Sequence, residues 1–272
     1  MAQLYEQTLA PYLDAGYAIV MTDYQGLGMA GDPSYLIGAI EGRNILDSIV
    51  AARQFPEAVL SETTLLIGHS QGGHAVAFAL QLAPDYASGL TIEGAVLAAP
   101  ALDPTGIFTT VAALNQPSQE TSLVLMVMSA WSTTYPEADL DDVATPAGQE
   151  LIATGIANSC LIEARLAASG ALPSDLFLPG AAATWSDFAA ENMPTAGPWA
   201  APVLILQGSA DEVLDPSLTA DFVATACASG SNVDYREIDG ANHFGLLARA
   251  ESEIIAWLDD RASGLPAAST CT

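Results

Sequence analysis

Short, almost uninterrupted apolar runs alternate along the chain with longer segments whose apolar residues recur at helical spacing. The runs predict buried strands at residues 17–21, 63–67, 92–98, 202–206 and 233–238. The helical spacing predicts helices over residues 3–15, 71–83 and 245–261, and one that carries Ile45, Leu46, Ile49 and Val50 and ends before Pro56. Apolar strands that alternate with helices are typical of an α/β fold whose mostly parallel sheet is covered on both faces.

Residues 101–195 interrupt this alternation, because they contain no clear strand between turn signals. Their apolar pieces, such as residues 123–128 and 151–166, are predicted to be helical. We therefore expect a core formed by residues 1–100 and 196–272, with residues 101–195 inserted as a helical cap over the carboxyl edge of the sheet. For Trp131 and Trp185 in this segment, we favour a core position over a place in a pocket lining.

The pentapeptide Gly68-His69-Ser70-Gln71-Gly72 stands directly between a predicted strand and a predicted helix. A strand, a tight glycine turn and a helix form the context of a nucleophile elbow, in which a serine at the tip exposes its Oγ. The pattern therefore indicates Ser70 as a nucleophile. The backbone N–H of Gln71 is then the expected oxyanion-hole donor to the tetrahedral intermediate.

A serine hydroxyl needs a base to take its proton, and the chain offers three histidines. His69 lies on the strand side of Ser70, where alternation turns its ring away from Oγ. His74 lies in the first turn of the next helix and is expected to pack or to make a local hydrogen bond. His243 follows the last predicted strand, at the required edge of the sheet, so exclusion leaves it as the base.

The carboxylate that orients such a base is expected between the serine and the histidine in chain order. We choose Asp211 because its loop begins at the end of the strand over residues 202–206, with Glu212 and Asp215 as alternatives. This carboxylate would fix the imidazole tautomer and stabilise the imidazolium. Asp23 precedes Ser70 and is assigned to holding the turn over residues 25–28.

Composition restricts the partners of this chain. Its 272 residues are 51% hydrophobic and 14% charged, which is typical of a globular protein. Asp and Glu total 32 against six Arg, and the net charge of −26 argues against nucleic acid or an anionic membrane as a partner. No apolar stretch reaches the length of a membrane span. The acidic cluster at residues 139–142 lacks the ligand spacing of a calcium loop and is expected to be a solvated turn. We expect neither a metal nor a cofactor.

With these residues in place, the chain resembles the secretory lipase family, within the α/β-hydrolase fold, over nearly its whole length. The resemblance rests on residues 16–20 with Asp23 and Gly26, and on residues 68–75, 211–213 and 241–243. It implies hydrolysis of triacylglycerols or other carboxylic esters through an acyl-enzyme, a helical lid, and export from the cell.

The front of the chain departs from the family pattern. Family members carry further strands, and a loop that lends an oxyanion-hole residue, before the helix that here begins near Gln3. We therefore expect that the chain starts after these strands and lacks the second oxyanion donor. Removing one such donor typically lowers the rate by roughly 10²–10³-fold.

The three cysteines bear on the compartment. Cys227 and Cys271 resemble the two positions that pair near the family's carboxyl terminus, and Cys160 resembles a cysteine whose partner lies in the absent front segment. We therefore expect one disulfide, one free thiol and a secreted protein, although residues 1–5 lack the features of a secretory signal. A cytoplasmic protein with three reduced cysteines is the alternative.

The sequence thus predicts a serine carboxylester hydrolase that acts on a small-molecule ester or lipid with apolar acyl groups. Two other interpretations stay open. The same triad could act on another acyl substrate, such as a peptide, a lactone or an acetylated natural product. A truncated α/β-hydrolase-fold protein with weak or no catalysis is the third. The oligomeric state is not predicted.

Overall fold

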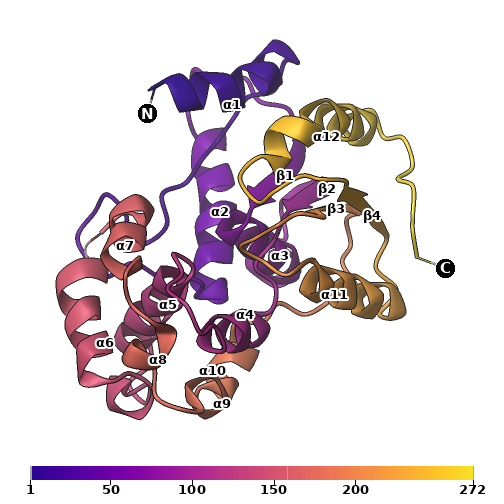
Figure 1. The fold of residues 1–272 in the computed structure, drawn as a ribbon. Helices are drawn as coiled ribbons and strands as arrows, with labels where there is room; N and C mark the ends of the chain where they lie inside the picture. Colours follow the sequence, from indigo (N-terminus) through magenta and orange to yellow (C-terminus); the bar gives the residue numbers. More distant parts are fainter. Residues whose placement is uncertain (1, 158, 272) are drawn as a thin grey trace. The chain divides into compact units, whose positions relative to one another are not determined.

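The computed structural model describes residues 2–157 and 159–271, which form two compact units (Figure 1). One unit comprises Met1–Thr22, Gly42–Leu102 and Pro194–Thr272, and the other comprises Asp23–Glu41 and Asp103–Met193. Residues 23–41, which we expected in the core, therefore belong with the inserted segment. Two hydrogen bonds explain this, because Trp131 Nε1 donates to the Leu36 carbonyl and the Gly38 N–H donates to Asn192 Oδ1.

The first unit is built on a parallel sheet in the order β1-β2-β3-β4. Its strands are β1 (Thr63–His69), β2 (Thr91–Ala98), β3 (Val203–Gly208) and β4 (Val233–Ile238). Neighbouring strands pair in parallel register, with Ile67 opposite Val96 and Leu97 opposite Ile205. The strands expected at residues 63–67, 92–98, 202–206 and 233–238 are confirmed.

The strand expected at residues 17–21 is wrong. This segment follows helix α1 (Ala2–Asp14) and pairs with none of the four strands of the described chain. Val20 and Met21 are 44% and 61% exposed. An apolar run favours burial, but a strand also needs a neighbouring backbone that completes its hydrogen-bond ladder. Sequence periodicity carries no information about that neighbour.

Helices cover both faces of this sheet. They are α2 (Gly38–Arg53), whose first residues belong to the second unit, α3 (Gln71–Tyr86), α11 (Pro216–Ala228) and α12 (Leu246–Ala262). Alternation along β3 separates two apolar clusters: Ile205 packs in the cluster that includes Val76 of α3 and Phe222 of α11, and Leu204 packs in the one that includes Ile254 of α12. Figure 1 shows α12 on the opposite side of the sheet from α3 and α11.

Helix α11 was not among the expected elements, although its start carries a recognisable signal. Asp215 accepts a hydrogen bond from the Ser217 N–H, and Pro216 occupies the first helical position. An aspartate cap followed by proline is a common helix start.

The second unit is mainly helical. Its elements are α4 (Pro104–Ala112), α5 (Thr121–Thr134), a 3₁₀ turn (Leu140–Asp142), α6 (Pro146–Leu151), a π-helical turn (Ile152–Ile156), α7 (Leu161–Ala168), α8 (Pro173–Leu176), α9 (Ala181–Thr184) and α10 (Ser186–Glu191). Trp131 and Trp185 are buried and stack with ring centroids 6.1 Å apart, so the core position expected for them is confirmed.

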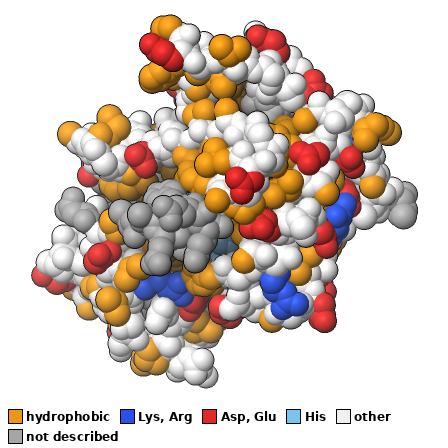
Figure 2. All heavy atoms as spheres, turned by 90° about the horizontal axis from the view of Figure 1, so that it is seen from above, with side chains coloured by type: hydrophobic (Ala, Val, Ile, Leu, Met, Phe, Trp, Pro, Cys, Tyr) orange, Lys and Arg blue, Asp and Glu red, His pale blue; other side chains and the backbone are white. Residues whose placement is uncertain are grey.

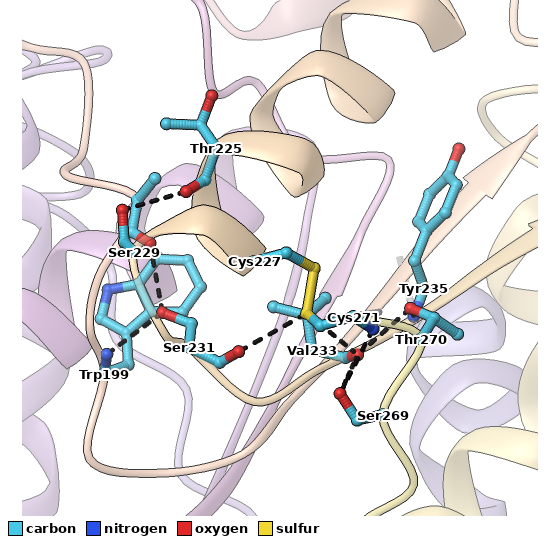
Figure 3. The surroundings of a disulfide bond; sticks show 11 residues. Trp199, Thr225, Cys227, Ser229, Ser231, Val233, Tyr235, Ser269, Thr270 and Cys271 are labelled. Carbon is cyan, nitrogen blue, oxygen red and sulfur yellow. Dashed lines mark hydrogen bonds between the residues drawn. A yellow bond between two sulfur atoms is a disulfide. The ribbon is translucent and has the colours of Figure 1, made fainter.

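One disulfide joins Cys227, near the end of α11, to Cys271 (Figure 3). The carboxyl-terminal segment runs beside β4, where the Thr270 N–H donates to the Val233 carbonyl over 2.8 Å. Cys160 is exposed and has no disulfide partner. The pairing implied by the family resemblance is therefore confirmed.

Surface charge follows the composition. Figure 2 shows acidic side chains scattered over one face, with few basic groups and several apolar patches between them. Among the described residues, no helix combines the length and the hydropathy that a membrane crossing requires.

Candidate active site

Ser70 occupies a strained turn between β1 and α3. Its φ of 57° lies in the left-handed region, which is unfavourable for a residue with a side chain. The turn is so tight that a Cβ on Gly68 would lie 2.0 Å from the Gly72 carbonyl oxygen, and one on Gly73 would lie 2.6 Å from Pro100. Of the two glycines in the pentapeptide, Gly68 is therefore sterically required, and Gly73 just after it is required as well, as a nucleophile elbow demands.

Backbone hydrogen bonds hold Ser70 in this conformation. Its N–H donates to the Ala98 carbonyl over 2.9 Å, and its carbonyl accepts from Ala101 over 3.2 Å. Its carbonyl also accepts from Gly73 in the first turn of α3. The side chain makes no helix-capping bond and is partly exposed. A strained residue persists when its surroundings fix it in this way, and such residues cluster at functional sites.

Asp211 and His243 form a buried pair at the ends of β3 and β4. Asp211 Oδ2 lies 2.8 Å from His243 Nδ1, and the two side chains are 0% and 2% exposed. The second carboxylate oxygen accepts the N–H groups of Val213 and Leu214 over 2.9 and 2.8 Å. Burial raises the pKa of Asp211, but the hydrogen bonds from His243, Leu214 and Val213 outweigh it and leave this pKa below its usual value. The carboxylate is therefore ionised at neutral pH.

This pairing assigns the tautomer of the neutral His243 ring. An ionised carboxylate can only accept, so Nδ1 of His243 carries the hydrogen that points at Asp211. Nε2 is then the unprotonated nitrogen and can accept a proton. An aspartate that selects this tautomer is what a histidine base requires.

His69 ties the elbow to the loop of His243. Its Nε2 lies 2.9 Å from the carbonyl oxygen of His243, and the two rings have centroids 4.6 Å apart. A carbonyl oxygen only accepts, so Nε2 of His69 carries the donated hydrogen. Burial lowers the pKa of His69, and the neighbouring His243 ring lowers it further. Strand alternation predicted only that the His69 ring turns away from Ser70, and nothing in the sequence indicated this contact with His243.

The structure joins two of the three expected triad residues directly. The hydrogen bonds of the described residues include the Asp211–His243 pair, but none between Ser70 Oγ and the His243 ring. Catalytic hydrogen bonds are often long without a substrate and shorten in the complex. Ser70 shares the edge of the sheet with the pair, because β1, β3 and β4 are parallel and its neighbour His69 contacts His243.

The alternative carboxylates make other contacts. Glu212 Oε2 accepts from the His243 backbone N–H over 3.4 Å, and Asp215 caps α11. His74 is buried and packs on Phe78 with ring centroids 4.9 Å apart, which confirms the packing role expected for it. Gln71 is the first residue of α3, directly after Ser70. In the part of the chain that the structure describes, no cluster of His, Cys, Asp and Glu is arranged to hold a metal ion.

Comparison with known proteins supplies an independent line of evidence. The family model for secretory lipases matches residues 1–171 and 185–270. A Mycobacterium tuberculosis protein named "Probable inactive lipase" is 28% identical over 268 residues, which are 93% of this chain and 57% of that protein. A secreted triacylglycerol lipase of Malassezia globosa is 26% identical over 276 residues, or 96% of this chain and 58% of the relative. The chain thus spans less than two thirds of the length of these curated relatives.

Solved structures show the same fold. Candida antarctica lipase A in its closed state superposes with a TM-score of 0.76 at 20% identity, over 88% of this chain and 57% of that one. The rice cell wall degrading esterase LipA from Xanthomonas oryzae gives a TM-score of 0.73 at 20% identity, over 89% of this chain and 71% of that one. The expected α/β-hydrolase fold is confirmed.

Proposed function

Because the chain belongs to the secretory lipase family, we propose that it hydrolyses carboxylic esters with Ser70 as nucleophile, His243 as base and Asp211 as the orienting acid. The observation that carries this proposal is the buried Asp211–His243 pair, whose 2.8 Å contact leaves His243 Nε2 as a proton acceptor. It lies at the edge of the sheet where Ser70 stands in a strained elbow.

The proposed reaction proceeds through an acyl-enzyme. Ser70 Oγ attacks the ester carbonyl while His243 Nε2 takes its proton, and the tetrahedral oxyanion accepts a hydrogen bond from the Gln71 N–H. The intermediate collapses as the imidazolium returns the proton to the departing alcohol. Water then attacks the acyl-enzyme, with His243 again as base, and releases the carboxylic acid. Asp211 stabilises the imidazolium in both halves and stays ionised.

Neutral esters of apolar acyl groups, of the triacylglycerol type, are the proposed substrates. The net charge of −26 disfavours anionic substrates, because the field of the protein repels them. The Malassezia globosa relative is named as a triacylglycerol lipase, which supports the same class. Secretion is also part of the proposal, since the Cys227–Cys271 disulfide suits an oxidising compartment.

The test measures covalent labelling by a fluorophosphonate and hydrolysis of p-nitrophenyl esters of increasing chain length. We expect labelling at Ser70, and a loss of about 10³-fold or more in kcat/KM for Ser70→Ala. Ser229→Ala is the control, because that exposed hydroxyl, directly after α11, donates to the Thr225 carbonyl of that helix. Full hydrolysis by Ser70→Ala would refute the assignment.

A second candidate is a family member that binds but does not turn over esters. The Mycobacterium tuberculosis relative whose name describes it as inactive supports it. Wild-type protein that is folded but neither labelled nor hydrolytic would favour this candidate. Labelling without multiple turnover would instead locate the defect after acylation.

A further inference from the structure

The buried side-chain amide of Gln207 lies between the Asp211 carboxylate and helix α11. Gln207 is the fifth residue of β3 and is 0% exposed. The other buried residues of this strand are apolar up to Leu206, so a leucine would fit the pattern at this position equally well. A buried amide is costly unless both of its ends find partners.

Both ends of the amide have a partner. Gln207 Nε2 donates to Asp211 Oδ2 over 2.9 Å, and Thr219 Oγ1 donates to Gln207 Oε1 over 2.9 Å. Thr219 is 2% exposed and lies in the first half of α11. The ionised carboxylate can only accept, which requires the amide nitrogen to face Asp211. The threonine hydroxyl then donates to the amide oxygen. Only this orientation of the amide gives hydrogen bonds to both its nitrogen and its oxygen.

The two oxygens of Asp211 are held in different ways. Oδ1 is bound by backbone N–H groups of its own loop, those of Val213 and Leu214. Oδ2 faces His243 Nδ1 and also receives the Gln207 amide. The amide therefore bonds the same oxygen that must stay aligned with the imidazole. A donor to a carboxylate also favours its ionised form.

We propose that Gln207 is a positioning residue which, with its amide fixed by Thr219, keeps Asp211 ionised and Oδ2 aligned with His243 Nδ1. The inference rests on the proposed function, because it assigns a role toward the proposed acid and base. A purely structural role, in which Gln207 ties β3 to α11, predicts a different experimental result. That role would lower stability without changing the pH dependence of the site.

The experiment measures the rate of fluorophosphonate labelling across the pH range for wild type and Gln207→Leu. We expect labelling to slow by about 10–100-fold, by analogy with the loss found when hydrogen-bond partners of metal-binding side chains are removed. We also expect the acid limb of the profile to move to higher pH, because a carboxylate that loses a donor holds its proton to higher pH. If labelling slows but the acid limb of the pH profile stays at its wild-type position, Gln207 only links β3 to α11. That result would overturn the proposal.

Variants at Thr219 test the second half of the network. Thr219→Val keeps the shape but removes the hydroxyl, and we expect a smaller shift of the acid limb in the same direction. Thr219→Ser keeps the hydroxyl and should restore the wild-type profile. In the Gln207→Leu background, Thr219→Val should add little, because the two residues act as one unit. Thr225→Val is the control on α11, since that exposed hydroxyl bonds the Asp221 carbonyl of the same helix.

A nuclear magnetic resonance measurement separates this proposal from the proposed function. The proton on His243 Nδ1 is a signal that does not depend on turnover, and with three histidines it can be assigned from single substitutions. As the pH is lowered, we expect this signal to be lost at a higher pH in Gln207→Leu than in wild type. If that variant does not fold, the same comparison is made with Thr219→Val. An unchanged signal overturns the positioning role even if wild type is labelled. An unlabelled wild type refutes the proposed function even if the signal behaves as expected.

Discussion

His69, the residue before the proposed nucleophile, donates from Nε2 to the carbonyl oxygen of His243, the proposed base, over 2.9 Å. The two residues are 174 positions apart in the sequence. The contact joins the end of β1 to the loop after β4 across the edge of the sheet. His69 is thereby placed to hold the base loop against the elbow.

Removal of this donor should loosen the base loop. His69→Phe keeps a ring but leaves the His243 carbonyl without its partner, and we expect a loss of about 1 kcal/mol of stability. A small displacement of the imidazole should also slow fluorophosphonate labelling by roughly 10–10²-fold. Urea unfolding and labelling rates check both effects. Tyr86→Phe is the control, because it removes an exposed hydrogen bond to Asp47. Wild-type stability and labelling in His69→Phe would exclude the proposed role.

His69 should also make stability depend on pH. The pKa of His69 is lowered from 6.5 in the folded chain, mainly by burial, so the unfolded chain binds the proton more readily. Stability should therefore fall as the pH decreases below about 6.5 towards the lowered pKa of the folded state. The contribution of Asp211, whose pKa is lowered from 3.8, is lost only below that value. The difference between the unfolding free energies of wild type and His69→Gln should change between pH 6.5 and the lowered pKa of His69, and parallel curves there would contradict the assignment.

Backbone strain at Ser70 should appear as a difference in unfolding free energy between two variants. Ser70→Gly accepts a φ of 57° without strain, whereas Ser70→Ala retains the unfavourable conformation. The relief of about 1–3 kcal/mol of backbone strain is offset by the extra chain entropy of glycine. We expect Ser70→Gly to be about 1 kcal/mol more stable than Ser70→Ala in thermal or urea unfolding. If Ser70→Gly is the less stable of the two, the elbow is not strained.

The close crossing at Gly68 should tolerate no side chain. A methyl group there would lie 2.0 Å from the Gly72 carbonyl oxygen, so Gly68→Ala must displace backbone. We expect a loss of about 3 kcal/mol or more, at the upper end of overpacking effects. Gly89→Ala is the matched control, because its Cβ would meet open space. Equal melting temperatures for the two variants would show that the elbow is looser than described.

The disulfide should contribute substantially to stability. It closes a loop with a sequence separation of 44 residues, for which the chain-entropy estimate is about 4 kcal/mol. Cys227→Ser, Cys271→Ser and the reduced wild type should lose similar amounts, whereas Cys160→Ser should lose little, since Cys160 is exposed and unpaired. Thiol titration of unfolded, unreduced protein should find one thiol. Three thiols would argue against both the pairing and secretion.

Sequence reasoning worked best where the chemistry is local. The elbow was predicted because a glycine turn between a strand and a helix is written in consecutive residues, 68–72. Four of the five expected strands were found, since an apolar run matches the requirement of a strand covered on both faces. Residues 17–21 have the same apolar composition, but the prediction of a strand there is wrong because no described strand pairs with them.

The site was predictable only in part, for a related reason. Exclusion among three histidines and the order of strands led to His243 and Asp211, and the structure pairs them. No sequence pattern indicated the contacts of His69 and Gln207. A histidine before the nucleophile and a glutamine near the end of a strand have no local feature that reveals a partner far along the chain.

The sequence by itself determined the order of the four strands, the strained turn at Ser70 and the residue types available for proton transfer, because these depend on neighbours along the chain. The tertiary structure decided which side chains meet. It brought β3 beside β4, so that Asp211 reaches His243, and packed α11 on β3, so that Thr219 reaches Gln207. Hydrogen bonds act over about 3 Å, and only folding sets distances of that size between residues remote in sequence.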